Sequence, residues 1–184
     1  MTDLLTRSPR TGTGRPRGDV QGIMNSPSVT IRDAAPGDLD GIADVHRGAR
    51  ATYYEGHLPE EAYNGPDELR RCREGTGRAI GSADRRVLCV LREDRVVAFA
   101  VLGFRTGEEK LFQFHVDPEL WRAGLGSVLH RACVTAWRDA AVTAARLEVF
   151  GPNRRAQAFY ARQGWVEDGH ADDHVTMSLA VDTL

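Results

Sequence analysis

Residues 111–129 read LFQFHVDPELWRAGLGSVL, and this stretch decides how the second half of the chain is expected to fold. An apolar strand is predicted to end at Val116, and an amphipathic helix is predicted to begin beside Gly124 and Gly126. Glycines at this point let the backbone approach a ligand, and the free N–H groups of the first helical turn then face an anion. The stretch therefore predicts a loop that holds a phosphate or diphosphate.

Two other phosphate-binding motifs are excluded. Leu129 stands where the dinucleotide-binding fingerprint requires a third glycine. The chain also contains no G-x-x-x-x-G-K-[ST] segment, which excludes a P-loop. Because a Gly-x-Gly turn also begins helices that bind nothing, the assignment depends on a second motif.

Residues 146–165, which read RLEVFGPNRRAQAFYARQGW, supply this second motif: a strand, a turn and a helix with Asn153 as its predicted N-cap. Together the two segments resemble the GNAT superfamily of acyl-CoA-dependent N-acetyltransferases, and the resemblance covers residues 28–184. The family's diphosphate loop reads [QR]-x-x-G-x-[GA], and residues 121–126 match it with two departures. Trp121 stands at the Gln/Arg position, and Arg122 stands where glycine is usual.

The resemblance implies an α/β (α+β) fold: a mixed, mostly antiparallel central sheet of about seven strands with helices on both faces. It also implies that the sheet splays between the strand ending at Val116 and the strand Leu147–Phe150. The residue pattern predicts a hairpin at Glu93-Asp94 between two apolar strands. Residues 50–66 read as a loop or a broken helix, and the helix that begins at Pro66 is expected to end near Arg73.

The resemblance also implies the co-substrate acetyl-CoA and the residues that contact it. These are Phe114, His115, Val116, Trp121, Arg122, Ala123, Gly124, Leu125, Gly126, Ser127, Asn153, Arg155, Ala156 and Tyr160. Arg122, Arg154 and Arg155 are the candidates for the phosphates, with solvated surface arginines as the alternative.

Tyr160 is the candidate general acid. It follows Asn153 by seven residues, so both side chains share one helix face about 10 Å apart along the axis. The resemblance to the family implies that the pantetheine arm of coenzyme A runs along this face and that its sulfur ends near Tyr160. The alternative is a half-buried tyrosine that only packs the helix on the sheet.

Glu148 is the candidate general base. An amine with a pKa of about 10.4 is neutral in only roughly one molecule in a few thousand at pH 7, so a base assists its attack. Glu148 alternates with apolar neighbours and either points into the cleft or lies on the solvated side of an edge strand. Glu108, Glu109 and His115 are further candidates for the same role.

Tyr53, Tyr54 and His57 resemble the family's acceptor-side loop, with burial of this loop against the sheet as the alternative. The implied acceptor is a small-molecule or peptide amine, and the sequence does not identify it. A metal is not expected, because His170 and His174 lie roughly 13 Å apart along an extended chain. The oligomeric state is left open, and a homodimer is allowed.

The composition indicates one domain, residues 28–184, preceded by an arm of residues 1–27. The arm is rich in Arg, Gly, Pro and Ser without hydrophobic periodicity, so it is expected to be disordered. Four arginines and two aspartates give it a charge of +2, and the net charge of the whole chain is −2. The remaining −4 argues against nucleic-acid binding by the domain.

Neither a membrane partner nor a secretory leader is expected, because no apolar run approaches the roughly 20 residues that span a bilayer. Three widely spaced cysteines are expected to be reduced, which favours a cytoplasmic protein. The leading hypothesis is an N-acetyltransferase that moves an acetyl group from acetyl-CoA to a primary amine by direct transfer in a ternary complex. The alternative is a non-catalytic acyl-CoA-binding or regulatory module on the same fold.

Overall fold

The computed structural model describes residues 28–107 and 109–181. The predicted N-terminal arm lies outside these residues. The strands are β1 (Val29–Asp33), β2 (Arg85–Arg92), β3 (Arg95–Gly103), β4 (Lys110–Val116), β5 (Ala144–Phe150), β6 (Val166–Ala171) and β7 (His174–Ala180). The α-helices are α1 (Leu39–Tyr54), α2 (Glu60–Asn64), α3 (Pro66–Ile80), α4 (Leu125–Asp139) and α5 (Arg154–Arg162). Short 3-10 helices, η1 (Pro36–Asp38) and η2 (Pro118–Leu120), precede α1 and α4.

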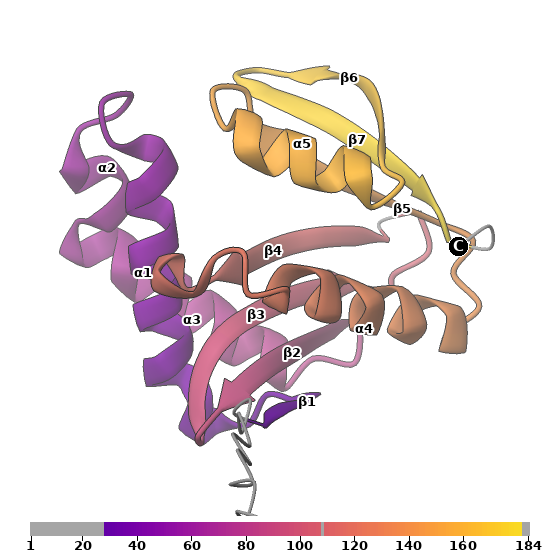
Figure 1. The fold of residues 1–184 in the computed structure, drawn as a ribbon, viewed down its shortest axis with the longest axis horizontal. Helices are drawn as coiled ribbons and strands as arrows, with labels where there is room; N and C mark the ends of the chain where they lie inside the picture. Colours follow the sequence, from indigo (N-terminus) through magenta and orange to yellow (C-terminus); the bar gives the residue numbers. More distant parts are fainter. Residues whose placement is uncertain (1–27, 108, 182–184) are drawn as a thin grey trace, which may run out of the picture.

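The seven strands form one sheet in the order β1-β2-β3-β4-β5-β7-β6 (Figure 1). All neighbouring strands are antiparallel except β4 and β5, which are parallel. The predicted fold class and sheet are therefore confirmed. The hairpin at Glu93-Asp94 is confirmed as well, and both of its residues have the positive φ angles of 51° and 61° that a tight two-residue turn requires.

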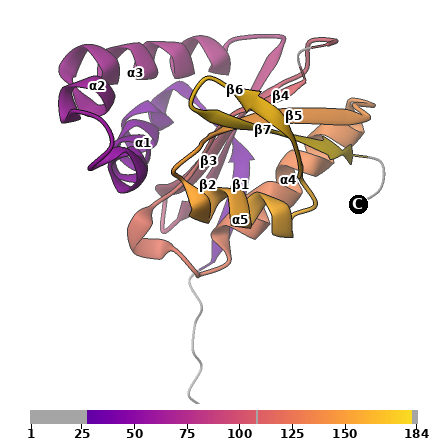
Figure 2. The same ribbon diagram turned by 90° about the horizontal axis from the view of Figure 1, so that it is seen from above.

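Helices cover both faces of the sheet (Figure 2). On β2, Val87 and Cys89 point into a core cluster shared with α1 and α3, whereas Leu88 and Val90 point into a larger cluster shared with α4. This alternation follows from the two-residue period of a strand. On α4, apolar residues at helical spacing give the helix one buried face, as its sequence predicts.

The sheet splays between β4 and β5. The two strands pair only at Lys110–Arg146 and Leu111–Leu147, and they diverge beyond this point. Between β4 and β3, the register shifts because Phe112 is an extra residue between two paired positions, which is a β-bulge. The remaining length of β4 therefore has a strand partner on the β3 side only, and the predicted splay is confirmed.

One local prediction needs correction, and the structure decides between the two alternatives of another. The helix that begins at Pro66 does not end near Arg73 but continues to Ile80, through Gly75 and Gly77. Burial of Thr76 and Ala79, where α3 packs on α1 and β2, offsets the low helix propensity of these glycines. The segment 50–66 is a broken helix, because α1 ends at Tyr54 and α2 follows at Glu60.

Candidate acyl-transfer site

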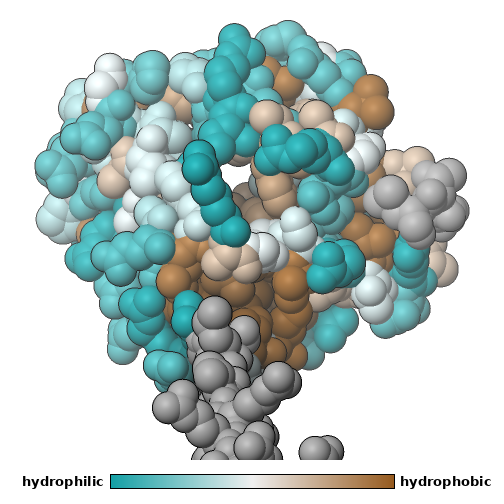
Figure 3. Space-filling model, in the orientation of Figure 1, coloured by the Kyte–Doolittle hydropathy of each residue, from teal (hydrophilic) through white to brown (hydrophobic). Residues whose placement is uncertain are grey.

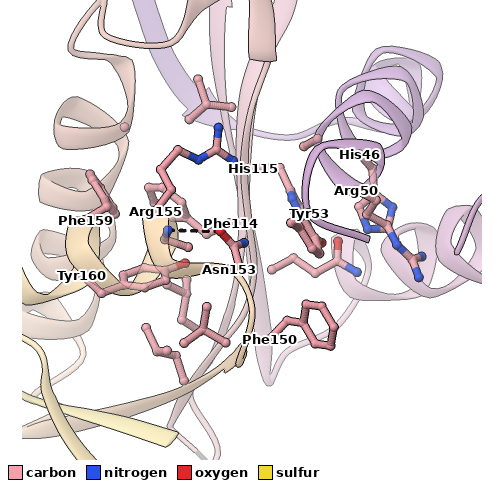
Figure 4. Close-up of a pocket in the computed structure, with 18 of the residues that line it drawn as sticks. His46, Arg50, Tyr53, Phe114, His115, Phe150, Asn153, Arg155, Phe159 and Tyr160 are labelled. Atoms are coloured by element: carbon pink, nitrogen blue, oxygen red, sulfur yellow. Dashed lines mark hydrogen bonds between the residues drawn. The ribbon is translucent and has the colours of Figure 1, made fainter. Parts of the chain in front are cut away.

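The gap between β4 and β5 opens into a cavity of about 960 Å³. Its walls come from α1 and α3 on one face of the sheet and from the start of α4 and from α5 on the other. Figure 3 shows the hollow open on one face of the molecule. Figure 4 shows that the side chains of Phe159 and Tyr160 lie on one side of the cavity and those of His46 and Tyr53 on the other. A long ligand can therefore enter on one face and reach the opposite face.

The glycine loop forms the start of α4 as predicted. Gly124 has a φ angle of 80° and is the N-cap of the helix. Gly126 lies in the first turn, and a Cβ atom added to it would lie 3.3 Å from Cε2 of Phe159. The first N–H groups of the helix have no partner within the helix, and the helix dipole adds positive potential there. The loop therefore has the open backbone and the polarity that an anionic group requires.

The backbone conformation of Arg122 shows how the loop tolerates one departure from the family's pattern. Its φ angle of 67° is left-handed, a conformation that glycine adopts without strain. The fold therefore keeps the backbone shape that glycine usually provides and places an arginine there. The Arg122 side chain lines the cavity, so the loop gains a cation.

The second motif forms β5 and α5. Oδ1 of Asn153 accepts a hydrogen bond of 3.2 Å from the backbone N–H of Ala156, which confirms Asn153 as the N-cap. Tyr160 is 8% exposed and its ring contacts those of Phe114 and Trp165. Burial raises the pKa of Tyr160 well above its ordinary value. The phenol therefore keeps its proton at neutral pH.

Glu148 reaches the cavity from the other face of the sheet. Leu147 and Val149 point into the core shared with α4, so Glu148 between them points toward the α1 side. Oε1 of Glu148 accepts a hydrogen bond of 2.5 Å from Nζ of Lys110, and the Glu148 side chain is 45% exposed. β5 is an inner strand, between β4 and β7, but Glu148 lies beyond its last pair with β4 and keeps a solvated side chain.

Aromatic rings form the wall of the cavity on the α1 side, where the acceptor was expected. Tyr54 contacts Tyr53 at 4.4 Å and Phe150 at 5.0 Å between ring centroids. Behind them, His46 and His115 lie 4.7 Å apart. Burial lowers the pKa of His46 to about 4 and that of His115 well below its ordinary value, so both imidazoles are neutral at neutral pH. The two imidazoles therefore add no charge to this wall at neutral pH.

A partly buried ion pair lies beside Tyr54 on this wall. Nη1 of Arg50 donates to Oε1 of Glu68 at 2.6 Å, and the same nitrogen lies 3.1 Å from Sγ of Cys72. Despite an opposing effect of burial, hydrogen bonds from Arg50, Arg71 and Cys72 lower the pKa of Glu68 to about 2. Burial raises the pKa of Cys72 to about 11, so its thiol is protonated at neutral pH.

Most residues predicted from the sequence meet in this cavity. The cavity is lined by Glu148, by Tyr53 and Tyr54, and by all predicted cofactor residues except Ala123. His57 does not line it and contacts the ring of Phe150 instead. Glu109 binds the backbone N–H of Gly107, and Glu108 lies outside the described residues.

Other cavity residues were missed by the sequence reasoning. They are mainly His46, Arg50, Glu68, Cys72, Gln113 and Phe150. The spacing of His46, Arg50 and Tyr53 at one helix face was the available signal, because residues three and four apart are neighbours on a helix. In the described part of the chain, no group of three or more metal-binding side chains is present. No described helix is both long and apolar enough to cross a membrane.

Comparison with solved structures gives the class of protein that this architecture defines. PaiA N-acetyltransferase from Thermoplasma acidophilum, solved in complex with coenzyme A, superposes with a TM-score of 0.78 at 19% identity, over 83% of this chain and 99% of that chain. The ribosomal-protein-S18-alanine N-acetyltransferase from Escherichia coli superposes with a TM-score of 0.64 at 20% identity, over 84% and 94% of the two chains. At these identities the likeness establishes the fold: that of the acetyltransferases.

Sequence comparison is more specific. The model of the Acetyltransferase (GNAT) family matches residues 43–165. The chain therefore belongs to the GNAT family and is an N-acetyltransferase, as the two sequence motifs predict. A curated relative, the [ribosomal protein bS18]-alanine N-acetyltransferase of Salmonella typhimurium, is 35% identical over 100 residues, which are 48% of this chain and 67% of the relative.

Proposed function

We propose that this chain transfers the acetyl group of acetyl-CoA directly to a primary amine within a ternary complex. The observation that carries the proposal is the position of Glu148 and Tyr160. They line one cavity from opposite faces of the sheet, which separates at the gap between β4 and β5. A thioester held in this gap would have a proton donor on its cofactor side and a carboxylate on its acceptor side.

The residues of the cavity fit coenzyme A. The free N–H groups at the start of α4 and the side chains of Arg122 and Arg155 suit its diphosphate. In the gap, the backbone groups of β4 that point away from β3 lack a strand partner beyond Leu111 and suit the amides of the pantetheine arm. Gly126 leaves room beside Phe159 where any larger side chain would intrude.

The transfer needs two proton movements. The amine nitrogen forms a bond to the thioester carbonyl carbon, and the bond from that carbon to sulfur breaks. Glu148 takes the proton that the amine loses, directly or through water, and Tyr160 gives a proton to the departing thiolate. Cys72 is the one described cysteine that lines the cavity, and its raised pKa makes it a poor nucleophile, which supports direct transfer without an acyl-enzyme.

The curated relative gives a first acceptor class to test, because its name specifies an alanine of a ribosomal protein. We infer a small-molecule or peptide amine as acceptor here. The experiment is a panel of amines, including peptides that begin with alanine, assayed for thiol release from acetyl-CoA. Thiol release that depends on an amine supports the proposal. Binding of acetyl-CoA with no thiol release for any amine would instead favour the non-catalytic module.

A further inference from the structure

The guanidinium of Arg155 connects three separate elements at the cavity. Its Cζ atom lies 3.1 Å from the centroid of the Trp121 ring, a cation–π contact with the diphosphate loop. Its Nη2 atom donates a hydrogen bond of 3.3 Å to Oγ1 of Thr52 on α1. Arg155 itself belongs to the first turn of α5, and Figure 4 shows it among the residues that line the cavity.

This cation has no anionic partner among the described residues. The guanidinium contacts the Trp121 ring and the Thr52 hydroxyl, and partial desolvation lowers its pKa. Arg155 lines the cavity and is exposed, so its guanidinium, which has no carboxylate partner there, is available to an anion. Arg154 is a useful contrast, because it bonds Gln157 and does not line the cavity.

Trp121 is held in position as a platform. Its Nε1 atom donates a hydrogen bond of 3.1 Å to the carbonyl oxygen of Val116 at the end of β4. The ring therefore stays beside the start of α4, whatever Arg155 does. The Thr52 contact is weaker: it is long, and the Thr52 hydroxyl also donates to the carbonyl oxygen of Ala49 at 2.6 Å. Of the two contacts, the one to Thr52 is the easier to exchange.

We propose that Arg155 is exchanged between Thr52 and the diphosphate of coenzyme A while it stays stacked on Trp121. The exchange releases the last turn of α1, which carries Tyr53 and Tyr54 in the acceptor wall. Cofactor binding is thereby coupled to the shape of the acceptor pocket through one side chain. The inference rests on the proposed use of coenzyme A and adds a competition that mutation can detect.

Tryptophan fluorescence reports the state of the stack directly. Trp121 is 36% exposed, whereas Trp137 and Trp165 are 0% and 3% exposed, so Trp121 is the ring that a ligand can reach. Emission of the full chain should change and saturate as coenzyme A is added. Pantetheine, which lacks the diphosphate, should leave it nearly unchanged. Trp121→Phe keeps an aromatic platform and should remove the signal.

The competition is tested by calorimetric titration of coenzyme A into variants. Arg155→Met should weaken binding roughly 10- to 100-fold, because a charged hydrogen bond to the ligand is lost. Arg154→Met is the matched control and should bind like the parent. Thr52→Val removes the competing hydroxyl and should tighten binding roughly 2- to 5-fold, whereas Thr52→Ser keeps the hydroxyl and should not.

The double variant separates competition from a merely structural effect. With Arg155→Met in place, Thr52→Val should no longer change the affinity. Unchanged or weaker binding in Thr52→Val, or equal effects of Thr52→Val in both backgrounds, would overturn the exchange. Failure of the parent chain to bind coenzyme A at all would instead overturn the proposed function on which it rests.

Discussion

Nζ of Lys110 lies 2.5 Å from Oε1 of Glu148, and this ion pair joins β4 to β5 at the point where their backbones stop pairing. The last paired residues are Leu111 and Leu147, so Glu148 is the first residue of β5 beyond the junction. An ion pair with this much exposure adds about 0–1 kcal/mol to stability. Its main consequence is to hold the carboxylate at the start of the gap.

Glu148→Gln should therefore lower turnover without harming the fold. The amide keeps the size of the side chain but cannot take a proton from the attacking amine, and a loss on the order of 100-fold or more is expected. The loss should be largest at low pH, where most of the amine is protonated. Thiol release measured across pH with a competent acceptor checks this. An unchanged profile would shift the base to His115, Glu108, Glu109 or bulk water.

Gly126→Val should weaken coenzyme A binding sharply. Even a Cβ atom at this position would lie 3.3 Å from the Phe159 ring, so a branched side chain must move either that ring or the backbone of α4. Either movement disturbs the N–H groups that face the diphosphate. A calorimetric titration should show at least about a tenfold loss. Gly126→Ala, as the milder variant, should lie between the parent and Gly126→Val, and parental affinity in Gly126→Val would contradict the diphosphate assignment.

Local sequence information was sufficient to predict the backbone structure on the α4 and α5 side of the cavity. The glycine loop, the Asn153 cap and Tyr160 all lie within two short segments whose geometry depends on neighbours in the chain. Even there, the stacking of Arg155 on Trp121 joins residues 34 positions apart by their numbering, and no local rule predicts it. The splay of the sheet came from the family resemblance.

The acceptor side was less predictable, because it is built by packing between helices. Arg50 meets Glu68 across 18 residues of sequence, through a contact that depends on how α1 lies against α3. The length of α3 was misjudged for the same reason, since Gly75 and Gly77 are poor helix formers and only tertiary burial explains why the helix continues. The resemblance to the family predicted that His57 belongs to the acceptor-side loop. In the structure, His57 is not among the residues that line the cavity.

Stability should fall as the pH drops from about 6.5 toward 4. Burial holds the pKa of His46 and His130 at about 4, below the ordinary 6.5, so the unfolded chain takes up protons first. Each group then removes about 1.4 kcal/mol of unfolding free energy per pH unit within this window. Stability is fully retained above pH 6.5. Urea unfolding at pH 7.5, 6.0 and 5.0 measures the slope.

One variant measures what a single histidine contributes to the slope of unfolding free energy against pH. Nε2 of His130 accepts a hydrogen bond of 2.9 Å from Nε1 of Trp165. In His130→Gln, the amide oxygen can accept the same bond but does not titrate, so the slope should fall by about 1.4 kcal/mol per pH unit. Because the pKa of Glu68 is lowered from the ordinary 4.5, this residue changes the pH dependence of stability only near and below pH 4.5. It does not contribute to the slope between pH 6.5 and 5. An unchanged slope in His130→Gln would contradict this origin.

Residues 1–27 should be dispensable. The first strand begins at Val29, and the described core begins at Ile42, so the sheet and both core clusters lie within residues 28–184. A chain that starts at Ser28 is expected to keep its thermal midpoint within about 2 °C and its affinity for coenzyme A. Thermal unfolding and calorimetry measure the two. A shortened chain that fails to fold would refute the predicted domain boundary.

Tyr160→Phe should separate binding from chemistry. The ring makes its contacts with Phe114 and Trp165 through its faces and edges, and phenylalanine preserves them, so stability and coenzyme A affinity should stay close to those of the parent. The hydroxyl is the lost group, and with it the proton for the departing thiolate. Loss of a positioned proton donor typically lowers the rate on the order of 100- to 10,000-fold.

The readout for Tyr160→Phe is a comparison of kcat with the acetyl-CoA KM, using an acceptor found in the amine panel. The proposal expects kcat to fall while KM stays nearly unchanged. Tyr160→Ala is the contrasting variant, because it also removes the ring and should lose stability, by about 3 kcal/mol or more. Full turnover in Tyr160→Phe would leave this tyrosine as a packing residue. The thiolate would then take its proton from water, and the gap between β4 and β5 would act by positioning the thioester alone.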